Sequence, residues 1–131
     1  MCKISRRDSL KASLLAGAAP VFYSSRSWSA QFEPIRIGLI GVGNRGNANL
    51  AEVAHENVVA LCDVDERYLN SAATQHQGAA TFRDYREMLD ADLDLDAVVV
   101  STPDRTHAPA SMAAMRRGLH CYCEKPLTHS V

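Results

Sequence analysis

The 131-residue sequence is poor in the residues that mark unusual classes of protein. With seven glycines and five prolines, it is neither collagen-like nor of low complexity. Its formal net charge of −1 gives no overall basic field that would attract nucleic acid. Apolar residues make up 47% and charged residues 22%, the balance of a globular domain, and the length fits one such domain.

Cysteine is also scarce, with four residues in the chain. Cys2 lies in the N-terminal segment considered below, and Cys62, Cys121 and Cys123 form no C-x-x-C pair and suggest no disulfide framework. Cys121 and Cys123 stand two apart in a predicted strand, so they face the same side of it. Metal binding by this pair is one alternative, but buried free thiols are the simpler interpretation, and we expect no metal site.

Positive charge is concentrated at the N-terminus. Residues 1–29 hold five of the 14 basic residues and one of the 15 acidic residues, so the rest of the chain carries a net charge of about −5. Ser5–Lys11 is a basic stretch with a twin arginine, and the apolar run Ala12–Tyr23 is shorter than the roughly 20 residues of a membrane span. Ser27–Ser29 then places small residues at alternate positions, as a signal peptidase site requires.

Residues 1–30 therefore resemble a twin-arginine (Tat) export signal, and we expect a folded domain over residues 31–131. Ser9 stands where such a signal usually has phenylalanine, whereas Leu10 and Lys11 fit it. Use of this signal predicts a periplasmic or otherwise exported protein, and a cytoplasmic one follows if the signal is not used. The alternative is an amphipathic N-terminal helix of the mature domain.

From Gln31 onward, apolar runs alternate with helical patterns. We expect strands at 35–40, 58–62, 79–82, 97–101 and 119–123, and helices at 43–55, 66–76, 84–89 and 108–117. Asp65 is expected to cap the second helix and Gly118 to end the last one. Because the strands are apolar throughout, both faces of the sheet must be covered. The predicted fold class is α/β, a doubly wound parallel sheet (Rossmann fold) that stops after its fifth strand, where a complete sheet often has a sixth.

A glycine-rich pattern, G-x-G-x-x-G, spans residues 41–46 between the first strand and the first helix, where a dinucleotide-binding fingerprint must lie. Gly41 permits the tight turn, Gly43 lets the backbone approach a diphosphate, and Gly46 lets the helix pack against the strand. The start of the helix offers N–H groups and the positive end of its dipole to the phosphates. A glycine-rich turn without a ligand is the alternative.

Asp63 ends the second strand, 22 residues after Gly41, where an acid accepts hydrogen bonds from the adenosine ribose hydroxyls. A carboxylate there would repel a 2′-phosphate, which favours NAD over NADP. Asp65 could share this role, although a helix cap is its simpler interpretation. Arg67 lies nearby and could offset the repulsion, so NADP is not excluded.

Polar residues also follow the fourth and fifth predicted strands, at the edge where open α/β sheets bind ligands. Ser101-Thr102-Pro103 ends the fourth strand, with His107 shortly after it, and Glu124-Lys125-Pro126 ends the fifth. A lone histidine before a helix is more often a surface or capping residue. A strand-end lysine is by default solvated, but Lys125 could reach a substrate hydroxyl near a nicotinamide and serve in proton transfer.

Taken together, these stretches resemble the Gfo/Idh/MocA family of oxidoreductases over about residues 34–131. The matching pieces are Gly38–Gly46, Cys62–Asp65, Val100–Pro103 with His107, and Glu124–Pro126. The resemblance implies a Rossmann domain bound to NAD(P), a second α/β domain, and hydride transfer at sugar or polyol carbons with Lys125 as the catalytic residue. It implies cofactor contacts from Gly41, Gly43, Asn44, Arg45, Gly46, Asp63, Ser101, Thr102, Pro103, His107 and Glu124.

The positions of the family's second domain, with most of its substrate contacts, do not occur in this sequence, so we expect the chain alone to bind a dinucleotide without efficient turnover. The sequence thus predicts the cofactor domain of an exported NAD(P)-dependent oxidoreductase with a sugar-like substrate, no nucleic-acid partner and no membrane span. It carries no indication of an oligomeric state. The alternatives are a non-catalytic dinucleotide-binding module and an inactive truncated remnant with an exposed sheet edge.

Overall fold

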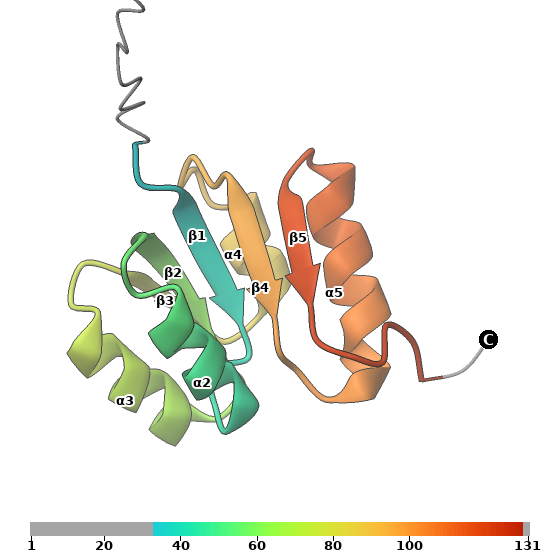
Figure 1. Cartoon of the computed structure of the whole chain (residues 1–131), viewed down its shortest axis with the longest axis horizontal. Coiled ribbons are helices and arrows are strands. Elements are labelled where there is room, and N and C mark those ends of the chain that lie inside the picture. The colour runs from blue at the N-terminus through green and yellow to red at the C-terminus, as the bar shows by residue number, and fades with distance from the viewer. Residues whose placement is uncertain (1–32, 130–131) are drawn as a thin grey trace, which may run out of the picture. The chain divides into compact units, whose positions relative to one another are not determined.

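The computed structural model describes residues 33–129, which form a five-stranded parallel sheet with helices on both faces (Figure 1). The strands are β1 (Arg36–Ile40), β2 (Asn57–Cys62), β3 (Ala80–Phe82), β4 (Ala97–Val100) and β5 (His120–Cys123), and the helices are α2 (Arg45–Glu52), α3 (Glu66–Gln75), α4 (Tyr85–Asp90) and α5 (Asp104–Arg116). The strand order β3-β2-β1-β4-β5 confirms the predicted doubly wound sheet. The export signal predicted for residues 1–30 lies outside the described residues.

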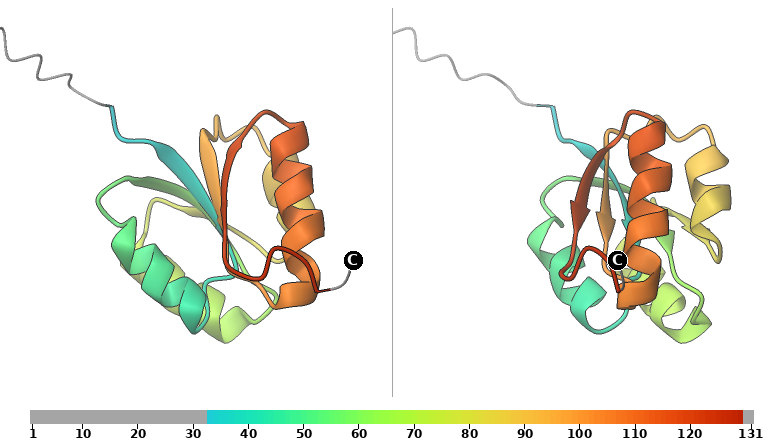
Figure 2. Two further views of the ribbon diagram at one scale, coloured as in Figure 1. Left: turned by 45° about the vertical axis from the view of Figure 1, so that its right-hand side comes forward. Right: turned by 90° about the vertical axis from the view of Figure 1, so that its right-hand side faces the viewer.

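Two apolar cores, one on each face of the sheet, hold the helices in place. Helices α2 and α3 cover one face, where Leu39, Leu50 and Leu61 are buried, and α4 and α5 cover the other, around Ile40 and Met88 (Figure 2). Because successive residues of a strand point to opposite faces, β1 contributes Leu39 to one core and Ile40 to the other. This burial on both sides explains why the strands are continuous apolar runs.

The strand boundaries lie within one residue of those predicted, whereas the first helix is shorter than predicted. It ends at Glu52 instead of His55, because the chain tightens there into a turn in which the N–H of Ala54 donates to the carbonyl of Ala51. The helices of residues 33–129 are 6 to 13 residues long, and none of them has the length and apolar character needed to cross a bilayer.

Helix α5 begins earlier than predicted, at Asp104 instead of Ala108. Its first turn is polar and gives no apolar periodicity, so the sequence pattern misses it. Asp104 places a carboxylate in that turn, where the helix dipole favours negative charge. Pro109 lies inside the helix, although a proline lacks the N–H that an interior residue donates. Its presence therefore argued against a helix that begins before it.

Two predicted helix caps are confirmed. The carboxylate of Asp65 accepts a hydrogen bond of 2.9 Å from a backbone N–H in the first turn of α3. Gly118 has a φ of 81°, its N–H donates to the carbonyl of Met115, and the N–H of Leu119 donates to the carbonyl of Ala114. This pair of bonds is a Schellman motif, which stops α5 and turns the chain into β5.

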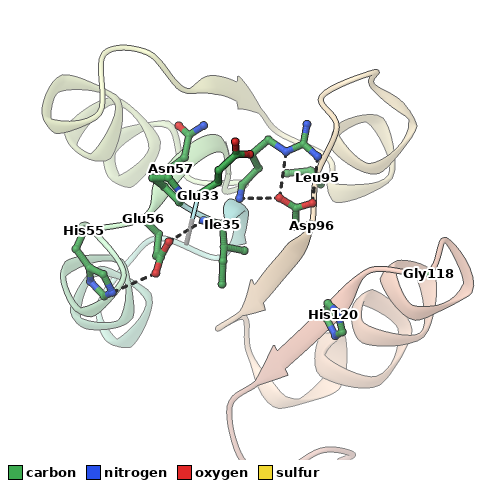
Figure 3. Close-up of a pocket in the computed structure, with 11 residues that line it drawn as sticks. Glu33, Ile35, His55, Glu56, Asn57, Leu95, Asp96, Gly118 and His120 are labelled. Carbon is green, nitrogen blue, oxygen red and sulfur yellow. Dashed lines mark hydrogen bonds and ion pairs between the residues drawn. The ribbon is translucent and has the colours of Figure 1, made fainter. Parts of the chain in front are cut away.

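A hollow of about 1080 Å³ opens at the amino ends of the strands (Figure 3). Its charged groups bind one another and the backbone. Arg36 Nε donates to Asp96 Oδ2 at 3.0 Å, and Glu56 Oε2 accepts from the backbone N–H of Ile35 at 2.7 Å, while its other oxygen lies 3.4 Å from Nε2 of His55. These contacts connect the start of β1 to the segments beside it, so the charged residues around this hollow stabilise the sheet.

Candidate functional site

A second cleft, of about 610 Å³, lies at the carboxyl ends of the strands. In a doubly wound sheet this edge binds ligands where neighbouring strands lead into helices on opposite faces, here between β1 and β4. Its volume is in the range of pockets that hold small molecules. Eight of the predicted site residues line it: Gly41, Gly43, Asn44, Arg45, Asp63, Ser101, Thr102 and Pro103.

The glycine-rich turn forms the floor of this cleft and has no room for side chains at two positions. Gly41 has a φ of 88°, and a Cβ there would lie 2.8 Å from the backbone of Ser101. A Cβ at Gly46 would lie 2.1 Å from the carbonyl oxygen of Gly41. Both distances are far shorter than van der Waals contact, so the start of α2 can lie against the turn only with glycine at these positions.

The middle glycine of the motif, Gly43, has a neighbour that the sequence did not indicate. A Cβ at Gly43 would lie 2.6 to 2.9 Å from ring atoms of Tyr68, which is in the first turn of α3 and also lines the cleft. The sequence predicts that the missing side chain makes room for a diphosphate. In the structure, the ring of Tyr68 occupies the space that a side chain at position 43 would fill.

The start of α2 suits an anion. The helix has no acidic residue in its first turn, and the side chain of Asn44, the residue before it, makes no capping hydrogen bond. The positive end of the helix dipole therefore has no carboxylate from the helix itself beside it, and of its first N–H groups that of Gly46 donates to the carbonyl of Gly43. A diphosphate bound at this place would complete the cap.

Asp63 is the acid that holds the glycine-rich turn. Its Oδ2 accepts from the backbone N–H of Val42 at 2.9 Å and of Gly43 at 3.2 Å, and its Oδ1 accepts from the N–H of Asp65 at 2.9 Å. Each carboxylate oxygen has two acceptor sites, so Oδ1 retains one for a further donor. The arrangement fits a ribose hydroxyl that donates to Oδ1 while a diphosphate lies against the adjacent turn.

Three arginines near Asp63 are paired with carboxylates. Arg67 makes two hydrogen bonds to Asp65, of 2.7 and 3.1 Å, and these bonds lower the pKa of that carboxyl to about 2. Arg83 lies 2.9 Å from an oxygen of Glu66. Arg86 pairs with Asp84 at 3.1 Å in the same way. The sequence offers Arg67 as a positive charge that could offset Asp63. In the structure, Arg67 is already paired with Asp65.

The loop after β4 forms the opposite wall of the cleft. The backbone N–H of Ser101 donates to the carbonyl of Ile40 at 2.8 Å, which fixes the loop against β1. The hydroxyl of Thr102 is buried and has no hydrogen-bond partner within residues 33–129. A buried hydroxyl without a partner is costly, so this wall of the cleft carries one polar group whose hydrogen bonding is incomplete.

Glu124 lies at the end of β5, outside the residues that line the cleft. Its Oε1 accepts from Asn49 Nδ2 at 2.9 Å and from Arg45 Nε at 2.9 Å. These bonds, that from Asn49 first, hold the pKa of Glu124 below its ordinary value. The side chain of Lys125, the next residue, is exposed at this edge of the sheet.

The structure excludes the alternative interpretation of His107 as a surface residue, and the cofactor contact implied for it stays a prediction. It lies in the first turn of α5 with only 2% of its surface exposed, and its Nδ1 is 2.7 Å from the carbonyl oxygen of Pro126. His107 is not among the residues that line the cleft, so its contact is with the chain segment around Lys125. The early start of α5 explains the difference, because it turns the histidine inward onto that segment.

Two residues of this region escaped the sequence analysis. Asn49 is buried on α2 and contacts both Ser101 and Glu124, and Tyr68 packs on the glycine-rich turn. The sequence did offer one indication for Asn49: it is a polar residue next to Leu50, on the apolar side of the helix. No cluster of His, Cys, Asp and Glu that could hold a metal ion occurs in residues 33–129.

Comparisons with known proteins agree with this geometry. Residues 35–131 match the model of an oxidoreductase family with an NAD-binding Rossmann fold, GFO_IDH_MocA. Inositol 2-dehydrogenase 4 of Saccharopolyspora erythraea is 37% identical over 98 residues, which cover 72% of this chain and 29% of that protein. A glycosyl hydrolase family 109 protein of Solibacter usitatus is 33% identical over an alignment that covers all of this chain and 35% of that protein.

Solved structures share the fold. Scyllo-inositol dehydrogenase of Lactobacillus casei, with bound NAD(H) and scyllo-inositol, superimposes with a TM-score of 0.69 at 27% identity, over 74% of this chain and 29% of that one. The WlbA dehydrogenase of Bordetella pertussis, in complex with NADH and UDP-GlcNAcA, gives 0.66 at 28% identity, over 72% and 30%. The chain spans about a third of the length of the relatives described here. By its glycine-rich turn, its fold and these matches, it belongs to the Gfo/Idh/MocA oxidoreductase family with an NAD-binding Rossmann fold.

Proposed function

We propose that this chain is the NAD(H)-binding part of an oxidoreductase that acts on a polyol or sugar. The observation that carries the proposal is the glycine-rich turn, which Asp63 ties to β2 through the N–H groups of Val42 and Gly43. This contact fixes the turn, at which the fold type binds a diphosphate, beside a carboxylate that can accept from a ribose. When bound, the nicotinamide supplies the acceptor or donor of a hydride.

A preference for NAD over NADP follows from the charges of the site. Asp63 would repel a 2′-phosphate, and the nearby Arg67, Arg83 and Arg86 are paired with acids of their own. Titration of the chain with NADH and NADPH, followed by nicotinamide fluorescence, tests this preference. We expect NADH to bind at least about 10-fold more tightly, since one charge-assisted hydrogen bond is worth roughly 1.5–3 kcal/mol. Equal or tighter binding of NADPH would contradict it.

Lys125 is the residue that we propose to act on the substrate. Its ammonium group can donate a hydrogen bond to a substrate hydroxyl at the carboxyl edge of the sheet. When the alcohol is oxidised, its carbon gives up a hydride and its hydroxyl gives up a proton, which Lys125 can accept only as the neutral amine. In the reverse reduction, the ammonium returns a proton to the oxygen. The inositol dehydrogenases among the relatives support polyols as the substrate class.

A Lys125→Met variant separates an enzyme from a non-catalytic binding module. In the longest natural protein that contains these residues, we expect turnover of NAD with inositols or sugars to fall by roughly 100-fold or more, while the Kd for NADH stays within twofold. Turnover that does not depend on Lys125 would exclude the catalytic role. A thermal melt of the 131-residue chain tests the third possibility, since an inactive remnant would show no transition with or without NADH.

The similarity to glycosyl hydrolase family 109 proteins, at 33% identity in the Solibacter usitatus protein, makes glycosides a second candidate substrate class. The two candidates differ in their products. A dehydrogenase reduces added NAD in step with the polyol that it consumes, whereas a hydrolase releases the leaving group of a chromogenic glycoside with no net change in NAD. Running both assays on one preparation decides between them.

Export through the Tat route is a further part of the proposal, supported by the basic stretch with Arg6 and Arg7 and the apolar run after it. Cell fractionation tests it. We expect the wild-type chain in the periplasm of a bacterial host and a double variant, Arg6→Lys with Arg7→Lys, in the cytoplasm. Identical distribution of the two proteins would count against export by this route.

A further inference from the structure

We propose that Lys125 is positioned by two side chains that contact its neighbours in the chain: Asn49, through Glu124, and His107, through Pro126. The E-K-P segment is here residues 124–126. This inference rests on the proposed role of Lys125 and adds two positioning residues to it, neither of which touches the lysine itself.

The E-K-P segment leaves the sheet at its first residue. The N–H of Glu124 donates to the carbonyl of Val100 at 2.9 Å and continues the β4–β5 ladder by one bond. Pro126 has no N–H with which to extend it. A catalytic group that is displaced by about 1 Å can lose roughly 100-fold in rate, so a lysine on this segment needs contacts other than the ladder to be effective.

Asn49 provides the first contact. It lies on α2 with 8% of its surface exposed, and its Nδ2 is 2.9 Å from Glu124 Oε1 and 2.8 Å from Ser101 Oγ. A carboxylate only accepts hydrogen bonds, so the nitrogen of the amide must face Glu124, and its two hydrogens serve the two partners. Asn49 thereby joins the ends of β4 and β5 to α2. Arg45 adds a bond to the same oxygen of Glu124 from a more exposed position.

His107 provides the second contact. A carbonyl oxygen only accepts, so the bond of 2.7 Å between the ring and Pro126 requires the proton on Nδ1. The opposite nitrogen, Nε2, is buried and has no partner within residues 33–129. The ring therefore makes a single described hydrogen bond, and that bond holds the residue that follows Lys125.

The two contacts come from opposite faces of the sheet. Helix α2 packs on one core and α5 on the other, and the chain after β5 passes the amino-terminal end of α5 (Figure 2). The residues on either side of Lys125 are thus fixed to separate helices. This leaves the lysine side chain exposed while its backbone is held on both sides.

Hydrogen exchange of the 131-residue chain tests this arrangement without catalysis. We expect the amide of Glu124, which donates to the carbonyl of Val100, to exchange roughly 10-fold faster in Asn49→Ala and His107→Leu, because each variant removes one contact that holds the E-K-P segment. His107→Asn keeps an N–H donor near the position of Nδ1 and should restore slow exchange. Ser111→Ala is the matched control, because Ser111 is equally buried one turn further along α5 and no hydrogen bond described here joins its hydroxyl to residues 124–126.

Kinetics of the longest natural protein that contains these residues provide the second measurement. We expect kcat to fall by roughly 10- to 100-fold in Asn49→Ala and His107→Leu, with the KM for NAD within about twofold of wild type and with recovery in His107→Asn. If Lys125→Met leaves turnover unchanged, the proposed catalytic role of Lys125 is wrong. The hydrogen-exchange result still tests separately whether Asn49 and His107 hold the E-K-P segment.

Three outcomes would overturn the positioning role. The first is wild-type exchange in both Asn49→Ala and His107→Leu. The second is an effect of Ser111→Ala as large as that of His107→Leu, which would indicate general loosening of α5. The third is failure of His107→Asn to recover slow exchange although it melts at the wild-type temperature.

Discussion

Charged groups lie at both ends of the sheet, but they have different hydrogen-bond partners. At the amino end, Arg36 pairs with Asp96 at 3.0 Å and with Asp94 at 3.3 Å. At the carboxyl end, Asp63 accepts only backbone N–H groups in the described structure, and the hydroxyl of Thr102 stays without a partner. The amino-end hollow is the larger of the two and its charges pair with one another, whereas the carboxyl end keeps an uncapped helix start and an acceptor site on Asp63 for a ligand.

The largest expected effect tests whether the carboxyl end depends on its close backbone contact. Gly46→Ala would place a Cβ 2.1 Å from the carbonyl of Gly41, and no flexible side chain can move aside there. We expect a loss of roughly 3–5 kcal/mol in the free energy of unfolding and no measurable NADH binding. Thermal melting measures the first effect and a fluorescence titration the second.

The control for this variant is Gly78→Ala. An added Cβ at Gly78 meets nothing within 4 Å. Its melting temperature and NADH affinity should match those of wild type. A similar loss in both variants would show that replacement of any glycine, and not the contact at Gly41, causes the effect.

The second prediction concerns the acid that holds the turn. Asp63→Ala removes the acceptor for two backbone N–H groups of the turn and for the ribose, so we expect NADH to bind roughly 10- to 100-fold more weakly. Calorimetric titration measures the change. Asp65→Ala is the comparison, because Asp65 caps α3 and pairs with Arg67 without contacting the turn, and it should change the Kd for NADH by less than twofold. Equal weakening in the two variants would contradict a special role for Asp63.

The smallest effect tests the amino end. The hydrogen bond from Arg36 lowers the pKa of Asp96 from 3.8 to about 2. Since the folded-state pKa is depressed, this contact stabilises the fold fully above about pH 4 and loses its contribution as the pH falls toward 2. Wild type should therefore melt a little above Asp96→Asn at pH 6, and the gap should close between pH 4 and 2. NADH affinity should be the same in both, and a change there would link the two ends of the sheet.

Features that depend on neighbouring residues were predictable from the sequence. The tight turn at Gly41, the cap at Asp65 and the stop at Gly118 all follow from local geometry, and the apolar strands follow from burial on both faces. The placement of Asp63 after β2 was equally predictable, because the fold type fixes where a strand-end acid lies relative to the turn.

Contacts between distant segments were not predictable in this way. Asn49 meets Glu124 across 75 residues, and nothing in the local pattern of α2 indicates a partner on β5. The burial of His107 depended on where α5 begins, and a polar first turn gave no periodicity from which to place it. The position of Tyr68 over Gly43 likewise depends on how α3 packs against the turn.

The bonds that Asp63 makes to the N–H groups of Val42 and Gly43 exist before any cofactor arrives. The loss of backbone entropy in this loop is therefore incurred during folding, and little of it remains to oppose association. Stopped-flow mixing with NADH should accordingly give a single exponential whose rate rises linearly with cofactor concentration. In this respect the chain would meet its ligand as a rigid receptor.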